Sequence, residues 1–130
     1  MEMNMVGWFE VPVLDMTRAV AFYNKVFQIE ISIHELGALT MGWFPFAEDQ
    51  NRPGAAGSLV KHPDAYKPSS DHGVLVYFSS RTGDLDDELS RVVAAGGEIL
   101  QAKTQISEEY GCMALFLDSE GNRIALHSPK

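Results

Sequence analysis

The stretch Gly111-Cys-Met-Ala-Leu-Phe-Leu-Asp-Ser-Glu-Gly-Asn-Arg-Ile-Ala-Leu-His-Ser128 predicts a strand, a tight turn and a returning strand. Apolar side chains occupy both faces of its first run, which is typical of a largely buried strand. Asp118, Gly121 and Asn122 supply the turn, because Asp can hydrogen-bond its own backbone and because Gly and Asn tolerate positive φ. These residues therefore predict a β-hairpin.

The residues before the hairpin predict a strand, a helix and another strand. We expect strands over residues 73–79 and 99–106, separated by a helix that begins after Asp84 and stops at Gly96-Gly97. One face of this helix is apolar and consists of Leu85, Leu89, Val92 and Val93. Its acids, Glu88 among them, are interpreted as an acidic first turn and a solvated face.

The first half of the chain repeats this order of elements. A strand over residues 6–13 precedes a helix capped by Asp15, and strands follow over 28–35, 39–46 and 58–62. The apolar face of the helix consists of Ala19, Phe22, Tyr23, Val26 and Phe27. The sequence thus predicts two units of the order β-α-β-β-β, each of which has an apolar sheet face to bury.

Residues 63–72 contain prolines, serines and aspartates, a mixture that predicts a linker. We therefore expect a single domain over residues 1–130, with module one at 1–62 and module two at 73–130. At 130 residues and 45% apolar content, the chain is long and apolar enough for a real core.

Charge and cysteine content narrow the classes of function. The formal net charge of −8 disfavours nucleic acid and anionic membranes as partners, because both would repel an acidic surface. The single cysteine, Cys112, excludes an internal disulfide framework and is interpreted as a packed thiol. The sequence shows neither an export signal nor an uninterrupted apolar run long enough for a membrane span, so we expect a cytoplasmic protein.

Three landmarks together carry a family resemblance. They are Val13-Leu-Asp15 followed by Arg18 and Phe22-Tyr, then Ala95-Gly-Gly97, and then Phe116-Leu-Asp-Ser-Glu-Gly-Asn122. Over essentially its whole length the chain resembles the vicinal oxygen chelate superfamily, the glyoxalase/bleomycin-resistance/dioxygenase group, and within it the small lactoylglutathione-lyase-related proteins. The resemblance implies an α+β fold in which two tandem βαβββ modules form a curved mixed sheet around a cleft. It also implies a homodimer and, in many members, a divalent metal.

The resemblance places four metal-ligand positions on this sequence. They fall on Trp8, Ser58, Leu75 (or Val74, if the register shifts by one) and Ala125. None of these side chains is a strong ligand, since a divalent cation needs several nitrogen or oxygen donors. We therefore expect no metal or other cofactor at the usual site, which disfavours glyoxalase I and extradiol dioxygenase activity.

Strand alternation offers other residues for the cleft, because residues two apart share a face. Glu10, Tyr77 and His127 then point into it, and Glu10 and His127 could act as general base and acid. Two alternatives stay open. The pair could simply hydrogen-bond each other, or it could hold a displaced metal with a third ligand such as Glu108 or His72.

Further candidates would contact a ligand rather than react with it. An aromatic wall is predicted from Trp8, Trp43, Phe44 and Tyr77. The full set of predicted substrate-binding residues is Trp8, Trp43, Ser58, Leu75, Tyr77, Tyr110 and Ala125. Lys61 or Lys67 could neutralise an anionic substrate, although solvated surface lysines are the commoner case. The sequence thus predicts a cleft protein that acts on or binds a small molecule, either as a glyoxalase-related lyase or isomerase or as a non-enzymatic, drug-sequestering protein.

Overall fold

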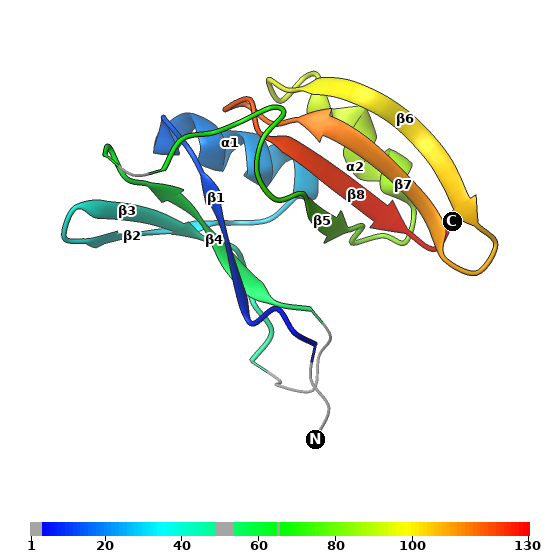
Figure 1. Cartoon of the computed structure of the whole chain (residues 1–130), viewed down its shortest axis with the longest axis horizontal. Coiled ribbons are helices and arrows are strands. Elements are labelled where there is room, and N and C mark those ends of the chain that lie inside the picture. Colours follow the sequence, from blue (N-terminus) through cyan, green and yellow to red (C-terminus); the bar gives the residue numbers. More distant parts are fainter. Residues whose placement is uncertain (1–3, 49–53, 65) are drawn as a thin grey trace.

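Two four-stranded mixed sheets and two helices make up the computed structural model, which describes residues 4–48, 54–64 and 66–130 (Figure 1). The elements in chain order are β1 (Trp8–Pro12), α1 (Met16–Phe27), β2 (Ser32–Leu36), β3 (Leu39–Trp43), β4 (Ala56–Lys61), β5 (Val76–Ser79), α2 (Leu85–Val92), β6 (Glu98–Ser107), β7 (Gly111–Leu117) and β8 (Arg123–Ser128). This order confirms the predicted α+β fold of two tandem βαβββ modules. No helix within the described residues is long and apolar enough to cross a membrane.

The two sheets have the same internal order but remain separate. The first runs β1-β4-β3-β2 and the second runs β5-β8-β7-β6, and in each the opening strand pairs in parallel with the closing strand of its module. In the described part of the chain no strand pairing joins β1 to β5. The expected curved sheet is therefore two open sheets, and both opening strands keep one free edge.

Helix α1 forms where its apolar spacing predicted it. The side chain of Asp15 accepts a hydrogen bond from the backbone N–H of Arg18 at 3.0 Å, and Gln28 ends the helix in a left-handed conformation. Its whole predicted apolar face is buried. The strand expected to start at residue 28 starts instead at Ser32, because the chain first turns out of the helix and Ile31 N–H binds the side chain of Asn24.

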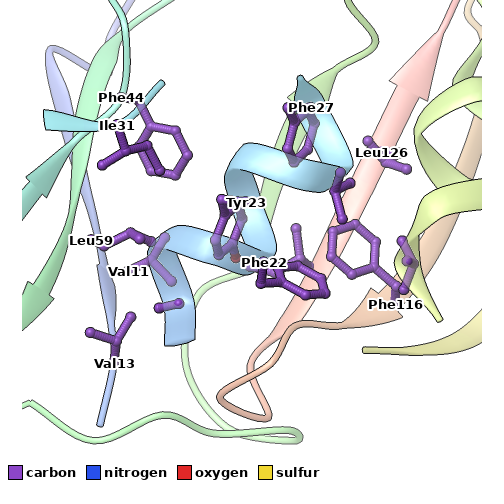
Figure 2. Packing of buried hydrophobic residues seen from close by; sticks show 14 of the residues in the cluster. Val11, Val13, Phe22, Tyr23, Phe27, Ile31, Phe44, Leu59, Phe116 and Leu126 are labelled. Carbon is purple, nitrogen blue, oxygen red and sulfur yellow. The ribbon is translucent and has the colours of Figure 1, made fainter. Parts of the chain in front are cut away.

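One core fills the space on the helix side of both sheets. Figure 2 shows α1 between side chains of the first sheet, such as Val11 and Leu59, and side chains of the second, such as Phe116 and Leu126. All four are at most 2% exposed. Because helix α1 contributes to both halves of this cluster, the two modules are stabilised by a shared hydrophobic core.

Two expectations for α2 are wrong. Glu88, expected on a solvated face, is fully buried, and its Oε2 accepts a hydrogen bond from the backbone N–H of Arg81 at 3.0 Å. Val93, expected on the apolar face, is 64% exposed and lies just beyond the last helical residue, Val92. One carboxylate oxygen of Glu88 is thus satisfied by the loop before α2, while among the described residues Oε1 has no hydrogen-bond partner.

The turn at residues 118–122 fastens module two to module one. The carboxylate of Glu120 accepts hydrogen bonds from the backbone N–H groups of Leu14 and Asp15, both at 2.8 Å, and pairs with Arg18 at 2.7 Å. The hydroxyl of Tyr23 donates to Asp118 at 2.7 Å within the core. These bonds connect the β7–β8 hairpin to the beginning of α1, so the hairpin turn also joins the modules.

Contacts at both ends of β1 fix its direction relative to β5. The side-chain amide of Asn122 donates to the carbonyl oxygen of Pro12 at 2.7 Å, next to the start of β8. At the other end the rings of Phe9 and Phe78 meet edge to face, with centroids 5.5 Å apart. Since β5 runs parallel to β8, the two free edges run in opposite directions with a space between them.

Candidate functional site

A cavity of about 890 Å³ lies between the free edges of β1 and β5. Successive residues of both strands line it, as expected where two unpaired strand edges face each other, and part of the 63–72 linker closes one side. Four predicted site residues line it: Trp8, Glu10, Leu75 and Tyr77. Its volume is within the range of small-molecule sites, which is about 300–1,000 Å³.

Glu10 is the one carboxylate among the described residues that line the cavity. Its Oε2 accepts a hydrogen bond from the indole N–H of Trp8 at 3.2 Å. The hydroxyl of Tyr66 also donates to this carboxylate, and that bond raises the pKa of Tyr66. Both donors are neutral, so they orient the carboxylate without cancelling its charge.

The members of the predicted aromatic wall that come from the first half of the chain, Trp8, Trp43 and Phe44, do not share one face. Trp43 meets Trp8 edge to face with ring centroids 6.4 Å apart, while the ring of His34, which the sequence did not indicate, lies 4.0 Å from that of Trp43. Phe44 points to the opposite face and packs in the core against Tyr23, with centroids 5.4 Å apart. Adjacent strand residues alternate between faces, so Trp43 and Phe44 cannot share a wall.

Two other predicted residues lie one strand behind the cavity edge. Ser58 of β4 is opposite Glu10 and Ala125 of β8 is opposite Tyr77, and both are fully buried. Neither belongs to the residues that line the cavity. Strand parity relates each of them to its neighbour on the opening strand, but it could not show which strands border the open space.

Glu10 and His127 have different partners. The imidazole Nε2 of His127 hydrogen-bonds the backbone carbonyl of Tyr110, whereas Glu10 binds Trp8 and Tyr66. Among the described residues no hydrogen bond joins Glu10 to His127, and neither Tyr110 nor His127 lines the cavity. The proposed acid–base roles of Glu10 and His127 stay predictions, and the structure provides no direct contact for them.

The residues at the expected metal positions do not fit a metal. The indole N–H of Trp8 donates to Glu10, and the Ser58 hydroxyl donates to the backbone carbonyls of Gly42 and Leu59. The other two positions are hydrocarbon side chains. Across residues 4–48, 54–64 and 66–130, no three His, Cys, Asp or Glu side chains are grouped to hold an ion.

Three basic side chains border the cavity: Lys67, Arg81 and Arg123. None of them has a carboxylate partner within 4 Å in the described part of the chain. Lys67 was considered from the sequence, but the two arginines were missed. The sequence gives only a weak signal that these arginines belong to a site, since an arginine beside a strand end is usually a solvated surface residue.

Comparison with known proteins gives one family match and several structural neighbours. A family model described as the Glyoxalase/Bleomycin resistance protein/Dioxygenase superfamily matches residues 5–126. None of the curated proteins matches the sequence.

The structural neighbours share the fold at low sequence identity. An antibiotic-binding protein, TnmS3, from Streptomyces sp. CB03234 is 23% identical, with a TM-score of 0.68 over 100% of this chain and 99% of that one. The fosfomycin resistance protein FosX from Listeria monocytogenes is 17% identical, with a TM-score of 0.65 over 100% and 94%. A variant of glyoxalase I from Zea mays is 17% identical, with a TM-score of 0.72; the match covers 95% of this chain but only 45% of the maize chain.

Proposed function

Because the chain belongs to the Glyoxalase/Bleomycin resistance protein/Dioxygenase superfamily, we propose that it binds a small molecule in the cavity between β1 and β5. The observation that carries this proposal is the cavity itself. Trp8 and Tyr77 line it, and so does Glu10, whose carboxylate is oriented by a hydrogen bond from Trp8. Aromatic walls with a few fixed polar groups are the usual construction of such sites.

Binding without chemistry is the version of this function that the geometry favours. Glu10 accepts hydrogen bonds from Trp8 of the cavity wall and from Tyr66 of the linker, and its proposed acid partner, His127, lies outside the lining. The neighbours described as antibiotic-binding and fosfomycin resistance proteins support the same reading by likeness of fold. We also propose that binding needs no metal, since the side chains at the four expected ligand positions are not suited to hold one.

A neutral fluorescent dye, N-phenyl-1-naphthylamine, tests the site directly. We expect saturable binding of one dye per cavity, unaffected by prior treatment with a chelator, and recovery of the dye unchanged. Tyr77→Ala should weaken binding about tenfold or more, because it removes an aromatic side chain from the wall. The matched control is Tyr110→Ala, which truncates another exposed tyrosine away from the cavity and should leave binding unaltered.

Some results would contradict the proposal. Equal losses in the two tyrosine variants would place the dye elsewhere, and no saturable binding at all would remove the cavity as a ligand site. Light scattering on the same samples gives the number of chains, for which we expect two. Loss of binding after chelation would overturn the metal-free reading while leaving the cavity as the site.

A further inference from the structure

The charge of the cavity differs in sign from the charge of the molecule. The chain carries 18 acidic and 10 basic side chains, for a net charge of −8. Among the described residues, Lys67, Arg81 and Arg123 line the cavity with a positive charge each, whereas Glu10 is the one carboxylate that does so. An acidic protein thus gathers basic residues around the space where its ligand would lie, and in the part of the chain that the structure describes none of them is paired with a carboxylate.

Two of the cations lie at the same end of the cavity. Arg123 opens β8, and its backbone N–H donates to the carbonyl of Ser69 at 3.2 Å, two residues after Lys67. The backbone N–H of Ser69 in turn donates to the side chain of Asn122 at 3.2 Å. These bonds tie the linker that carries Lys67 to the strand that carries Arg123.

The third cation marks the other end. β5 begins beside Ile124 and finishes beside His127, and Arg81 follows two residues after its last residue, Ser79. Arg81 is also exposed, while Arg123 is partly buried. A charge on a partly buried residue is less screened by solvent than one on an exposed residue, and the fork of donors of an arginine suits an oxyanion.

We propose that the end of the cavity formed by Arg123 and Lys67 is a subsite for an oxyanion, so that the ligand is an anionic aromatic or apolar compound. This inference rests on the proposed function, because it names the chemical class of the ligand in the same cavity. Arg123 forms charge-assisted hydrogen bonds to the oxyanion, and Lys67 adds a second positive charge from the linker. The rings of Trp8 and Tyr77 contact the apolar part of the ligand.

Two dyes that share an aromatic ring system distinguish the effect of the ligand's charge from binding in the cavity itself. The anionic probe is 1-anilinonaphthalene-8-sulfonate, and its neutral counterpart is N-phenyl-1-naphthylamine. We expect Arg123→Gln to weaken binding of the sulfonate about tenfold, and Lys67→Gln to weaken it by a smaller factor. Binding of the neutral dye should be unchanged in both. Raising the salt concentration should lower affinity for the sulfonate only, because exposed charges are screened.

Two further variants serve as controls on charge and on position. Lys61→Gln removes a positive charge from β4 outside the cavity lining, and Arg81→Gln removes one at the opposite end. Lys61→Gln should keep sulfonate binding within about twofold of the unmodified protein, and Arg81→Gln should weaken it less than Arg123→Gln does. Competition by phenyl phosphate and by benzoate then shows whether the subsite prefers a phosphate or a carboxylate. Thermal melts establish that each variant is folded.

The outcomes separate this inference from the function on which it rests. If the neutral dye binds as expected but Arg123→Gln leaves sulfonate binding intact, the anion subsite is wrong and the binding function stands. The same conclusion follows if Lys61→Gln or Arg81→Gln has as large an effect as Arg123→Gln. If neither dye binds in a saturable way, both the subsite and the proposed function are overturned.

Discussion

A single carboxylate, that of Glu120, makes the connection between the modules dependent on pH. Burial alone would raise the pKa of Glu120, but the hydrogen bonds from Arg18 and from the backbone N–H groups of Asp15 and Leu14 outweigh it. The net effect lowers the pKa from 4.5 to about 2. A pKa lowered by folding means that the ionised form stabilises the native state, so protonation removes that stabilisation.

Glu120→Gln should lower the free energy of unfolding at pH 7 by about 1–3 kcal/mol, because it removes a charged acceptor from several donors. The contribution of Glu120 is present above about pH 4.5 and is lost as the pH falls toward 2. The difference between the unmodified protein and the variant should therefore shrink over this window in urea denaturation.

The control for this prediction is Glu109→Gln, since Glu109 is exposed and has no hydrogen-bonded side chain among the described residues. Burial raises the pKa of Asp118, so the contribution of Asp118 to stability changes with pH in the opposite direction to that of Glu120. Asp118 is present in every protein compared, so its effect cancels in the difference. A difference between the unmodified protein and Glu120→Gln that stays constant down to pH 2 would contradict the assignment.

At the scale of the element, the sequence predicted what local patterns control. Helix α1 needed only its cap at Asp15 and its apolar spacing, and both are properties of neighbouring residues. The bonds of Glu120 were missed, because its partners lie 102 to 106 residues away and no spacing encodes them. Glu88 was misjudged for a different reason: its partner Arg81 is only 7 residues away, but the path of the loop before α2 does not follow from a helical spacing.

The candidate site was predicted in part, for a related physical reason. Alternation along β1 and β5 predicted part of the cavity wall, including Glu10 and Tyr77, but successive residues of both strands line it, so residues such as Phe9 and Phe78 were missed. It could not give the order of strands in each sheet, which decides that Ser58 and Ala125 are covered. Nor could it bring Arg123 to the linker, because that contact follows from the way the modules are joined.

The junction between α2 and β6 depends on a residue with no side chain. A Cβ atom on Gly97 would meet the backbone carbonyl of Leu117, as well as Phe22 at 2.7 Å and Val92 at 2.9 Å. Gly97→Ala should therefore lower the free energy of unfolding by about 1–3 kcal/mol or more, measured by urea denaturation, because the carbonyl cannot move aside without disturbing its strand.

The matched control is Gly7→Ala, whose added Cβ would have nothing within 4 Å. This substitution should change the free energy of unfolding by no more than about 0.5 kcal/mol. Equal stability of the two alanine variants would contradict this prediction, because it would mean that the surroundings of Gly97 have room for a Cβ atom.

At the scale of the whole molecule, the shared core predicts that the two modules unfold together. Helix α1 packs between side chains of both sheets, so neither module can lose its structure without exposing apolar surface of the other (Figure 2). Trp8 and Trp43, the two tryptophans of the chain, both belong to the first sheet, whereas far-UV circular dichroism reports on both sheets.

Urea unfolding followed by tryptophan fluorescence and by circular dichroism should therefore give one transition with the same midpoint. A fluorescence midpoint well separated from the dichroism midpoint would show that the modules unfold independently. Adding N-phenyl-1-naphthylamine should move both midpoints upward together, since a ligand that binds only the native state stabilises it by mass action.

The bonds of the 118–122 turn also have a consequence for the breadth of ligands that this scaffold can accept. Asn122 ties the end of β1 to the start of β8 through the carbonyl of Pro12, while Phe9 and Phe78 meet at the opposite end. The width of the space between β1 and β5 is thus set by side-chain contacts at its two ends. Selection for a wider or narrower compound can act on these contacts at the two ends of the cavity, while Trp8 and Tyr77 of the aromatic wall keep their identity.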